Sequence, residues 1–324
     1  MTLIDERAHI SDAEPEALGP IDPHEPPAEL LAIDSLMAVH SGRWTFLILD
    51  GAAFMMQAMH PIIAEVTGRY SASFKGDSSG RAIRSVDSVL RWTYGGQEAI
   101  AEGNRVREMH RTLTMKSKTG KQISALNPDA YQWVIATGYL ILSKAGKQLI
   151  GREFTEAEKQ ELIDDSRKHG RILHVPMKGY PRTPAEFDAY FEKHLPTLEA
   201  SPQALYLVEE LRSGRVEVPS AVPAPLRPLY RALGRPVARL GYLSVIGLLD
   251  PRLRDVLGVT WTAEEQKQFE RRFTIIRRLY DVLPDRLTYF PLAYHARKHH
   301  QCIQQMKERE KKSYIHRVEE FRVD

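Results

Sequence analysis

Histidine is the residue type in this chain best suited to hold a metal, and His110 has the most informative surroundings. Val106, His110 and Leu113 follow one another at spacings of four and three residues. This spacing puts the three side chains on one face of a helix, so the imidazole is expected to point inward, away from Arg105 and Arg111. An inward imidazole can hydrogen-bond within a core. It can also be the single protein ligand of a haem iron, because the porphyrin supplies four nitrogens.

Two arginines and a serine form a second group at the start of another expected helix. Arg81, Arg84 and Ser85 stand at positions i, i+3 and i+4 and are therefore presented side by side. Guanidinium groups there suit haem propionates or a bound oxygen molecule, and the alternative is a helix start with arginines in water. His60 precedes Pro61 at the end of an apolar, methionine-rich helix. It either lines the same pocket or caps that helix.

Other familiar signatures do not carry chemistry here. One such signature is the nucleophile elbow, which the string Gly76-Asp77-Ser78-Ser79-Gly80 matches. A serine of this kind works only at the turn between a buried strand and a helix, so a flexible loop is expected here instead. The chain has no His-Glu-x-x-His zinc motif and no Glu-x-x-His di-iron motif. His295 and His299 lie one helical turn apart among cationic side chains that would repel a divalent metal, so a solvated face is expected.

The elements that must position these residues are helices. Threonine followed three residues later by glutamate is the capping-box signature of a helix start. It occurs at Thr155 with Glu158, Thr183 with Glu186 and Thr262 with Glu265. Apolar residues then recur every three or four positions, and alternating runs of strand length are absent apart from a short stretch at 216–218. The predicted fold class is all-α.

Composition limits the class of protein. The 324 residues are 43% hydrophobic, and 45 Lys and Arg face 42 Asp and Glu, so the net charge of +3 gives no argument for nucleic-acid binding. Cys302 is the only cysteine, which excludes an internal disulfide and a thiolate metal site. The first residues lack the features of a signal peptide, and the longest apolar stretches suit core helices rather than membrane spans. A cytoplasmic protein is expected.

The chain divides by composition into three parts. Residues 1–29 are acidic and rich in proline and predict a weakly structured arm. Residues 30–298 predict a single helical domain, in which residues 212–240 form a connector with prolines that interrupt any long helix and arginines spaced by four. This connector is either a solvated basic loop or a contact with a membrane surface or the active-site mouth. Residues 299–324 predict a charged, solvent-facing helix or tail.

Six short motifs, taken together, resemble the bacterial branch of the MpaB-type oxygenase family, which includes the rubber oxygenases called latex-clearing proteins. The motifs, in chain order, are Gln57-Ala58-Met59-His60-Pro61, Arg81-Ala82-Ile83-Arg84-Ser85, Val106-Arg107-Glu108-Met109-His110, Ser124-Ala125-Leu126-Asn127-Pro128 with Trp133-Val134-Ile135-Ala136-Thr137, Thr183-Pro184-Ala185-Glu186-Phe187, and Pro251-Arg252-Leu253-Arg254-Asp255-Val256-Leu257-Gly258. The resemblance extends from about Ser41 to Arg297.

The resemblance implies a helical fold with a globin-like core around one haem b. His110 matches the histidine that ligates the iron on the proximal side. Arg81, Arg84 and Ser85 match a family triplet of Arg, Lys and Thr on the oxygen-binding side. A guanidinium stays protonated, so Arg84 is not expected to ligate iron as a lysine can. Ile135 stands where short bacterial members tend to carry a histidine.

The expected function is therefore that of a haem b-dependent oxygenase that uses dioxygen on an apolar, isoprenoid-like or polyketide-like substrate. His110 would set the basicity of the iron, and Arg81 and Ser85 would hydrogen-bond the bound oxygen or a propionate. A further expectation is an apolar substrate channel lined by Phe54 and by the methionines Met55, Met56 and Met59. Two alternatives remain at this point: a haem-binding sensor or carrier without turnover, and a cofactor-free helical protein in which His110 is an ordinary core residue.

Overall fold

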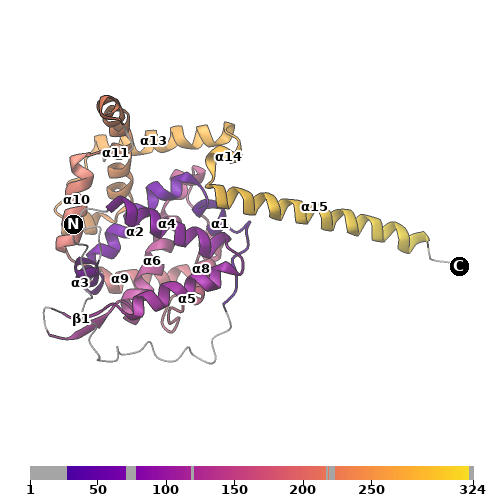
Figure 1. Ribbon diagram of the computed structural model, residues 1–324, viewed down its shortest axis with the longest axis horizontal. Coiled ribbons are helices and arrows are strands. Elements are labelled where there is room, and N and C mark those ends of the chain that lie inside the picture. The colour runs from indigo at the N-terminus through magenta and orange to yellow at the C-terminus, as the bar shows by residue number, and fades with distance from the viewer. Residues whose placement is uncertain (1–27, 71–77, 118–119, 217, 219–222, 321–324) are drawn as a thin grey trace.

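The computed structural model describes residues 28–70, 78–117, 120–216, 218 and 223–320, with only the backbone for 78–83 and 312–320. The helices are α1 (Leu36–Ser41), α2 (Trp44–Met59), α3 (Pro61–Tyr70), α4 (Ser78–Tyr94), α5 (Glu98–Arg111), α6 (Pro128–Lys144), α7 (Gly146–Ile150), α8 (Glu156–Ile172), α9 (Pro184–His194), α10 (Pro202–Ser213), α11 (Arg227–Leu248), α12 (Pro251–Val256), α13 (Ala263–Val282), α14 (Asp285–Thr288) and α15 (Pro291–Glu320). Two 3-10 turns, η2 (Leu195–Thr197) and η3 (Ala224–Leu226), complete the helical elements. The fold is all-α (Figure 1), as predicted.

The helix starts follow the predicted signals. Thr155 and Thr262 each form a complete capping box with the glutamate three residues later. The hydroxyl of Thr183 accepts a hydrogen bond from the amide of Glu186, but the Glu186 carboxylate accepts from the amide of Arg182 instead of closing the box. Each cap satisfies amides that the first helical turn leaves open, which is why the sequence signals these boundaries well.

A short hairpin that was not expected from the sequence lies between α5 and α6. Strand β1 (Thr114–Lys116) pairs antiparallel with β2 (Gln122–Ser124). At the turn, Gly120 has a φ of +81° and donates from its amide to the carbonyl of Ser117. Each strand is too short for a period of two residues to be recognisable, and the stretch at 216–218 that was expected as a strand includes a residue outside the described part.

Helix α2 is the centre of the core. It packs against α11 and α6, and also against α1, α3 and α10, while α6 packs against α8. Met55, Met56 and Met59 are completely buried in the resulting cluster, where they act as core side chains, and Phe54 is half-buried. Methionine suits such a position because its flexible side chain fills irregular gaps between helices that cross at different angles.

Within the described residues, no single helix combines the length and the hydropathy of a membrane span. Helices α2 and α3 would meet the criterion only together, and they are bent by 99° relative to each other.

The predicted interruption of a long helix by the prolines of 212–240 is wrong. Helix α11 extends for 22 residues, with Pro228 in its first turn and Pro236 inside it. Pro228 falls where a helix amide has no partner, and Pro236 removes only one helical hydrogen bond. The carbonyl of Pro236 accepts from Arg272 of α13, and the second half of α11 is buried against α2 and α13. This tertiary packing offsets the local free-energy cost of a proline inside the helix.

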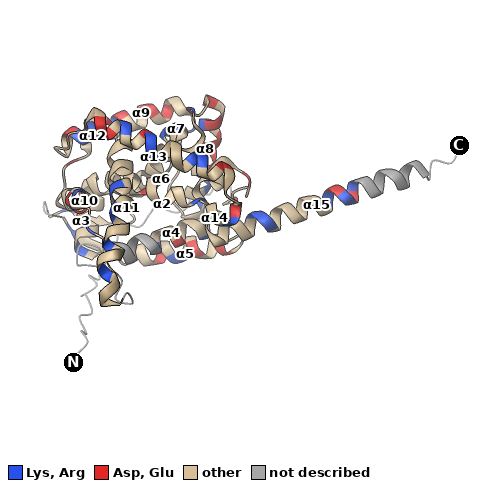
Figure 2. Cartoon of the chain, turned by 90° about the horizontal axis from the view of Figure 1, so that it is seen from above, with Lys and Arg blue, Asp and Glu red and all other residues tan. Residues whose placement is uncertain are grey.

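The two ends of the chain differ in what can be described. Most of the expected acidic arm, residues 1–27, lies outside the described residues. Helix α15 leaves the body and projects outward (Figure 2), and its side chains are exposed from Gln301 to Lys311. At its base, Arg297 donates to the carbonyl of Ile33 and lies over the ring of Tyr289. The described side chains of this projecting part therefore face solvent.

Asp50 provides a pH-dependent test of the core. This carboxyl on α2 is 8% exposed, and burial raises its pKa to about 7 from 3.8. Between these two pKa values, Asp50 is ionised in the unfolded chain but protonated in the native state. The free energy of unfolding therefore falls as the pH rises from about 4 to 7 and is then level. Asp50→Asn should therefore unfold at a higher urea concentration than the wild type at pH 8 and show no gain at pH 4. An equal effect at both values would contradict this account.

Candidate functional site

The helix that carries His110 is held by a close backbone crossing. Gly103 of α5 lies so near α8 that a Cβ atom there would stand 1.9 Å from the carbonyl oxygen of Ile172. Only glycine permits this approach. Val106, one turn further along, is buried, and His174 just beyond α8 lies 2.6 Å from the Oδ1 of Asn104. The C-terminal end of α5 is therefore fixed in place.

His110 lies in the last turn of α5 and is half-buried. The edge of its ring meets Tyr131 in a T-shaped contact, with 5.8 Å between ring centroids and 80° between planes. Tyr131 is itself buried on α6 and donates its hydroxyl hydrogen to the carbonyl of Leu173. Arg107 is close enough for its positive charge to oppose the rise that burial causes in the pKa of Tyr131. The imidazole thus has a fixed aromatic neighbour, and Tyr131 in turn lies near a cation.

A buried carboxylate joins α5 to α4, the helix that carries the arginine group. Glu102 accepts hydrogen bonds from Arg105 at 2.7 and 2.6 Å, from Ser88 at 2.6 Å and from Arg91 at 3.3 Å. The hydrogen bonds from Arg105, followed by that from Ser88, lower the pKa of Glu102 to about 2 despite its burial. Glu102 is therefore ionised at neutral pH. Only the spacing of three residues between Glu102 and Arg105 could have indicated this network in the sequence.

The arginine group lies at the start of α4, which packs along α5. Arg84 is exposed and Ser85 is half-buried, while the side chain of Arg81 lies outside the described residues. Arg84 and Ser85 of this group and His110 therefore lie on neighbouring helices.

His60 belongs to a different polar cluster. It ends α2 as its C-cap residue, and its side chain is buried with Nε2 3.2 Å from the Asp129 carboxylate. His194 of α9 places its own Nε2 3.0 Å from the other oxygen of Asp129. Hydrogen bonds from His194 and then from His60 hold the pKa of Asp129 well below its usual range. Sequence reasoning placed His60 near a helix end but missed Asp129 and His194, which are distant in the chain.

Both ring nitrogens of His194 have a polar partner. Its Nδ1 lies 2.8 Å from the carbonyl oxygen of Tyr190, and its Nε2 faces the Asp129 carboxylate. Trp133 stacks on the His194 ring at 5.2 Å and donates its indole hydrogen to the carbonyl of Met56. These contacts join the segment around Trp133 to the C-terminal end of α2 and to α9.

Asp129→Asn is expected to weaken this cluster. The substitution removes the negative charge that two buried imidazoles share, and because the Asp129 side chain is 59% exposed, solvent screening limits the loss to about 1 kcal/mol. The ionic contribution of Asp129 is present above pH 4 and is lost as the pH falls below it, so the two proteins should converge in acid. Urea unfolding at pH 7 and pH 3 measures both effects, and an equal difference at the two pH values would contradict the assignment.

A cavity lies elsewhere in the fold. It has a volume of about 660 Å³ and is lined by residues of α6 to α9 and of α11 to α13, including Lys144, Arg254 and Arg277. Lys144 ends α6, whereas Tyr131 lies in its first turn, so the two are separated by about 20 Å along the helix at 1.5 Å per residue. The cavity is therefore distinct from the surroundings of His110.

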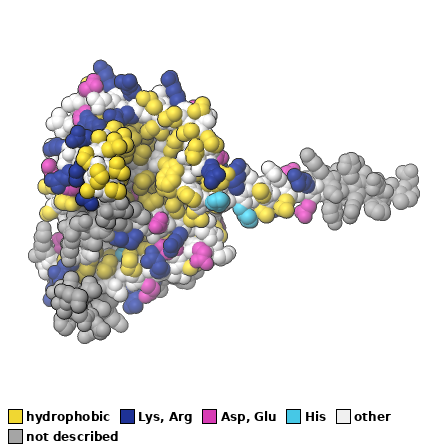
Figure 3. All heavy atoms as spheres, turned by 45° about the horizontal axis from the view of Figure 1, so that its top comes forward, with side chains coloured by type: hydrophobic (Ala, Val, Ile, Leu, Met, Phe, Trp, Pro, Cys, Tyr) yellow, Lys and Arg dark blue, Asp and Glu magenta, His cyan; other side chains and the backbone are white. Residues whose placement is uncertain are grey.

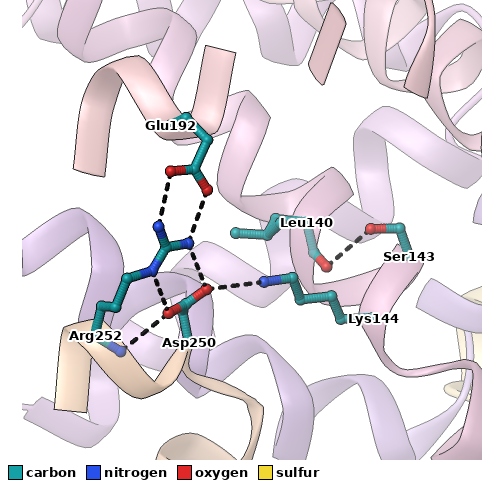
Figure 4. A network of polar contacts seen from close by, with 6 residues as sticks. All are labelled: Leu140, Ser143, Lys144, Glu192, Asp250 and Arg252. Carbon is teal, nitrogen blue, oxygen red and sulfur yellow. Dashed lines mark hydrogen bonds and ion pairs between the residues drawn. The ribbon is translucent and has the colours of Figure 1, made fainter. Parts of the chain in front are cut away.

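An ion-pair network includes Lys144 and Asp250, two residues that line this cavity (Figure 4). Arg252 makes a two-pronged contact with Glu192 at 2.7 and 2.8 Å and also bonds Asp250 at 3.0 Å. Lys144 lies 3.9 Å from Asp250 and 4.9 Å from the centre of the Phe191 ring, and burial lowers the pKa of its ammonium group. Arg252, which belongs to the motif that begins at Pro251, thus joins α12 to α9.

The other candidate groups carry no metal-binding geometry. Within the described part of the chain, no group of three or more His, Cys, Asp or Glu side chains could hold a metal ion. His295 and His299 are exposed on α15, in agreement with the solvated face that was expected. Gly76 and Asp77 of the apparent nucleophile elbow lie outside the described residues, and the backbone of 78–80 is the helical start of α4.

Comparisons with known proteins give the chain its relatives. Two proteins described as uncharacterised, one from Mycobacterium bovis and one from Mycobacterium tuberculosis, are each 24% identical to it over 181 residues. The aligned region is 56% of this chain and 66% of each relative, slightly under two thirds of their length. No solved structure matches the chain. The family model described as "ER-bound oxygenase mpaB/B'/Rubber oxygenase, catalytic domain" matches residues 38–278. The chain therefore belongs to the family of ER-bound oxygenase mpaB/B' and rubber oxygenase catalytic domains.

Proposed function

We propose that this protein is a haem b-dependent oxygenase in which His110 holds the iron. The observation that carries the proposal is the placement of His110, whose half-buried ring is fixed by Tyr131 at the end of α5. His110 would hold the iron through a ring nitrogen.

The donor set around His110 fits a haem by its chemistry. The porphyrin needs one protein ligand, apolar contacts for its faces and cations for its two propionates. His110 supplies the ligand, Val106 and Tyr131 supply apolar surface, and Arg107 and Arg84 supply cations on the two neighbouring helices. When bound, the haem would supply the activation of dioxygen.

The chain's own residues would have separate tasks. Tyr131 would orient the His110 ring through the edge contact, and the Glu102 network would keep α4 and α5 in register. Arg84 cannot give up its proton and so would bind a propionate or donate to a ligand on the iron. Ser85 is a second donor for that role. His60 is held by Asp129, so we assign it to positioning the α2–α3 bend rather than to the cofactor.

The substrate class follows from the family rather than from a described cavity. Membership of an oxygenase family that includes rubber oxygenases supports an apolar, unsaturated substrate such as an isoprenoid chain. The alternative function is that of a haem carrier without turnover. It would use the same His110, and an activity assay distinguishes it from an enzyme.

The absorption spectrum of the purified protein is the decisive test. An oxygenase of this kind should show a Soret band after isolation or after haem addition, with one haem per chain. It should then consume dioxygen steadily when given a reductant and an unsaturated isoprenoid lipid. A Soret band with no substrate-dependent oxygen uptake favours the carrier, and no haem binding at all rejects both.

A further inference from the structure

Helix α11 begins outside the body of the protein. Residues 227–237 are exposed except for Gly234, and the buried part of the helix starts only at Tyr242. Three apolar side chains in this projecting half are largely in solvent: Leu229 is 57%, Leu233 is 68% and Val237 is 66% exposed. Because they are spaced by four, they form a single apolar stripe along the helix.

A basic stripe occupies nearly the opposite side of the same turns. This stripe consists of three arginines that are also spaced by four: Arg227, Arg231 and Arg235. They are offset by two residues from the apolar stripe, and this offset corresponds to slightly more than half a helical turn. The whole of α11 contains no Asp or Glu. A helix with one apolar face, one cationic face and no acidic side chain has the composition of helices that lie in a membrane interface.

The apolar surface continues onto α13. Ile275, Leu279 and Val282 follow each other at four and three residues and are exposed, Val282 at 77%. Arg272, one turn before Ile275, donates to the carbonyl of Pro236 in α11, so this flank of α13 faces the same side of the molecule as α11. Figure 3 shows a broad hydrophobic expanse on that side, with Lys and Arg side chains around the projecting part. An expanse of this kind marks an interaction site.

We infer that this face, the α11–α13 apolar face, docks onto the surface of a bilayer that contains anionic lipids. A bilayer interface satisfies both stripes at once, because acyl chains receive the leucines while phosphate groups surround the arginines. A second copy of this chain that packs on the apolar stripe would leave the arginine stripe, about half a turn away on the helix, outside the contact. The inference is independent of the haem proposal, since no residue of the face belongs to the surroundings of His110.

Vesicle co-sedimentation of the full chain tests the inference. We expect binding to vesicles of phosphatidylcholine with about one-third phosphatidylglycerol, weaker binding to phosphatidylcholine alone, and a marked loss when NaCl rises from about 0.1 M to about 0.5 M. The double variant Leu229→Glu with Leu233→Glu should bind at least about tenfold more weakly. Arg231→Glu with Arg235→Glu should remove the preference for the anionic vesicles.

Met306→Glu on α15 is the matched control, because Met306 is 60% exposed but lies on the projecting C-terminal helix. It should bind like the wild type, and circular dichroism should show unchanged helix content in every variant. The inference is overturned if the wild type does not bind anionic vesicles, or if the leucine variant binds as well as the control. A wild-type dimer that the leucine variant converts to a monomer, without vesicle binding, would assign the face to self-association instead.

Discussion

His110→Ala is expected to abolish haem retention while the helical signal in circular dichroism stays at the wild-type level. The imidazole is the only protein ligand that the proposal assigns to the iron, so its removal leaves the porphyrin with apolar contacts and propionate pairing alone. The ratio of Soret absorbance to protein should fall by at least about tenfold after gel filtration. The fold should survive because His110 is half-buried and its neighbour Tyr131 keeps its own bond to Leu173.

A matched control separates coordination from general damage. His295→Ala removes an exposed histidine on α15 and should retain the wild-type haem content. Addition of free imidazole to the His110→Ala protein should restore part of the Soret band, because the small cavity left by the side chain can admit the missing ligand. Full haem occupancy in the His110→Ala protein would refute the assignment of His110 to the iron.

Gly103→Ala should destabilise the protein strongly although it adds a single methyl group. The new Cβ would lie 1.9 Å from the carbonyl oxygen and 2.9 Å from the carbonyl carbon of Ile172. Both atoms belong to the backbone of α8 and cannot rotate away, so α5 and α8 must separate. We expect a loss of about 3 kcal/mol or more in the free energy of unfolding, measured in urea. Since α5 also carries His110, haem affinity should fall as well.

The control for this substitution is another glycine in a helix. A Cβ at Gly138 of α6 would meet nothing within 4 Å, so Gly138→Ala should be neutral or stabilise the protein by up to about 1 kcal/mol. If Gly103→Ala also stays within about 1 kcal/mol of the wild type, the two helices are not locked by this crossing. The fixed position of His110 would then need another cause.

Tertiary context corrected several readings of local pattern. Pro236 is a strong local signal against a helix, yet packing of α11 on α2 and α13 overrides it. The methionines of α2 looked suited to a substrate channel, but they fill the core, since α2 is surrounded by helices on most sides. His60 ends its helix as expected, whereas its bond to Asp129 depends on a helix start that lies 69 positions away.

The amino-acid sequence alone determined the helical class, the helix starts and the family of this chain. These follow from interactions within a few residues, such as caps at Thr155 and Thr262, and from short motifs that keep their order. Only the tertiary structure decided which side chains meet: Glu102 with Ser88, Asp129 with two histidines, and His110 with Tyr131. Such contacts depend on the crossing of helices far apart in the chain, and helical periodicity specifies which face is buried but not what it is buried against.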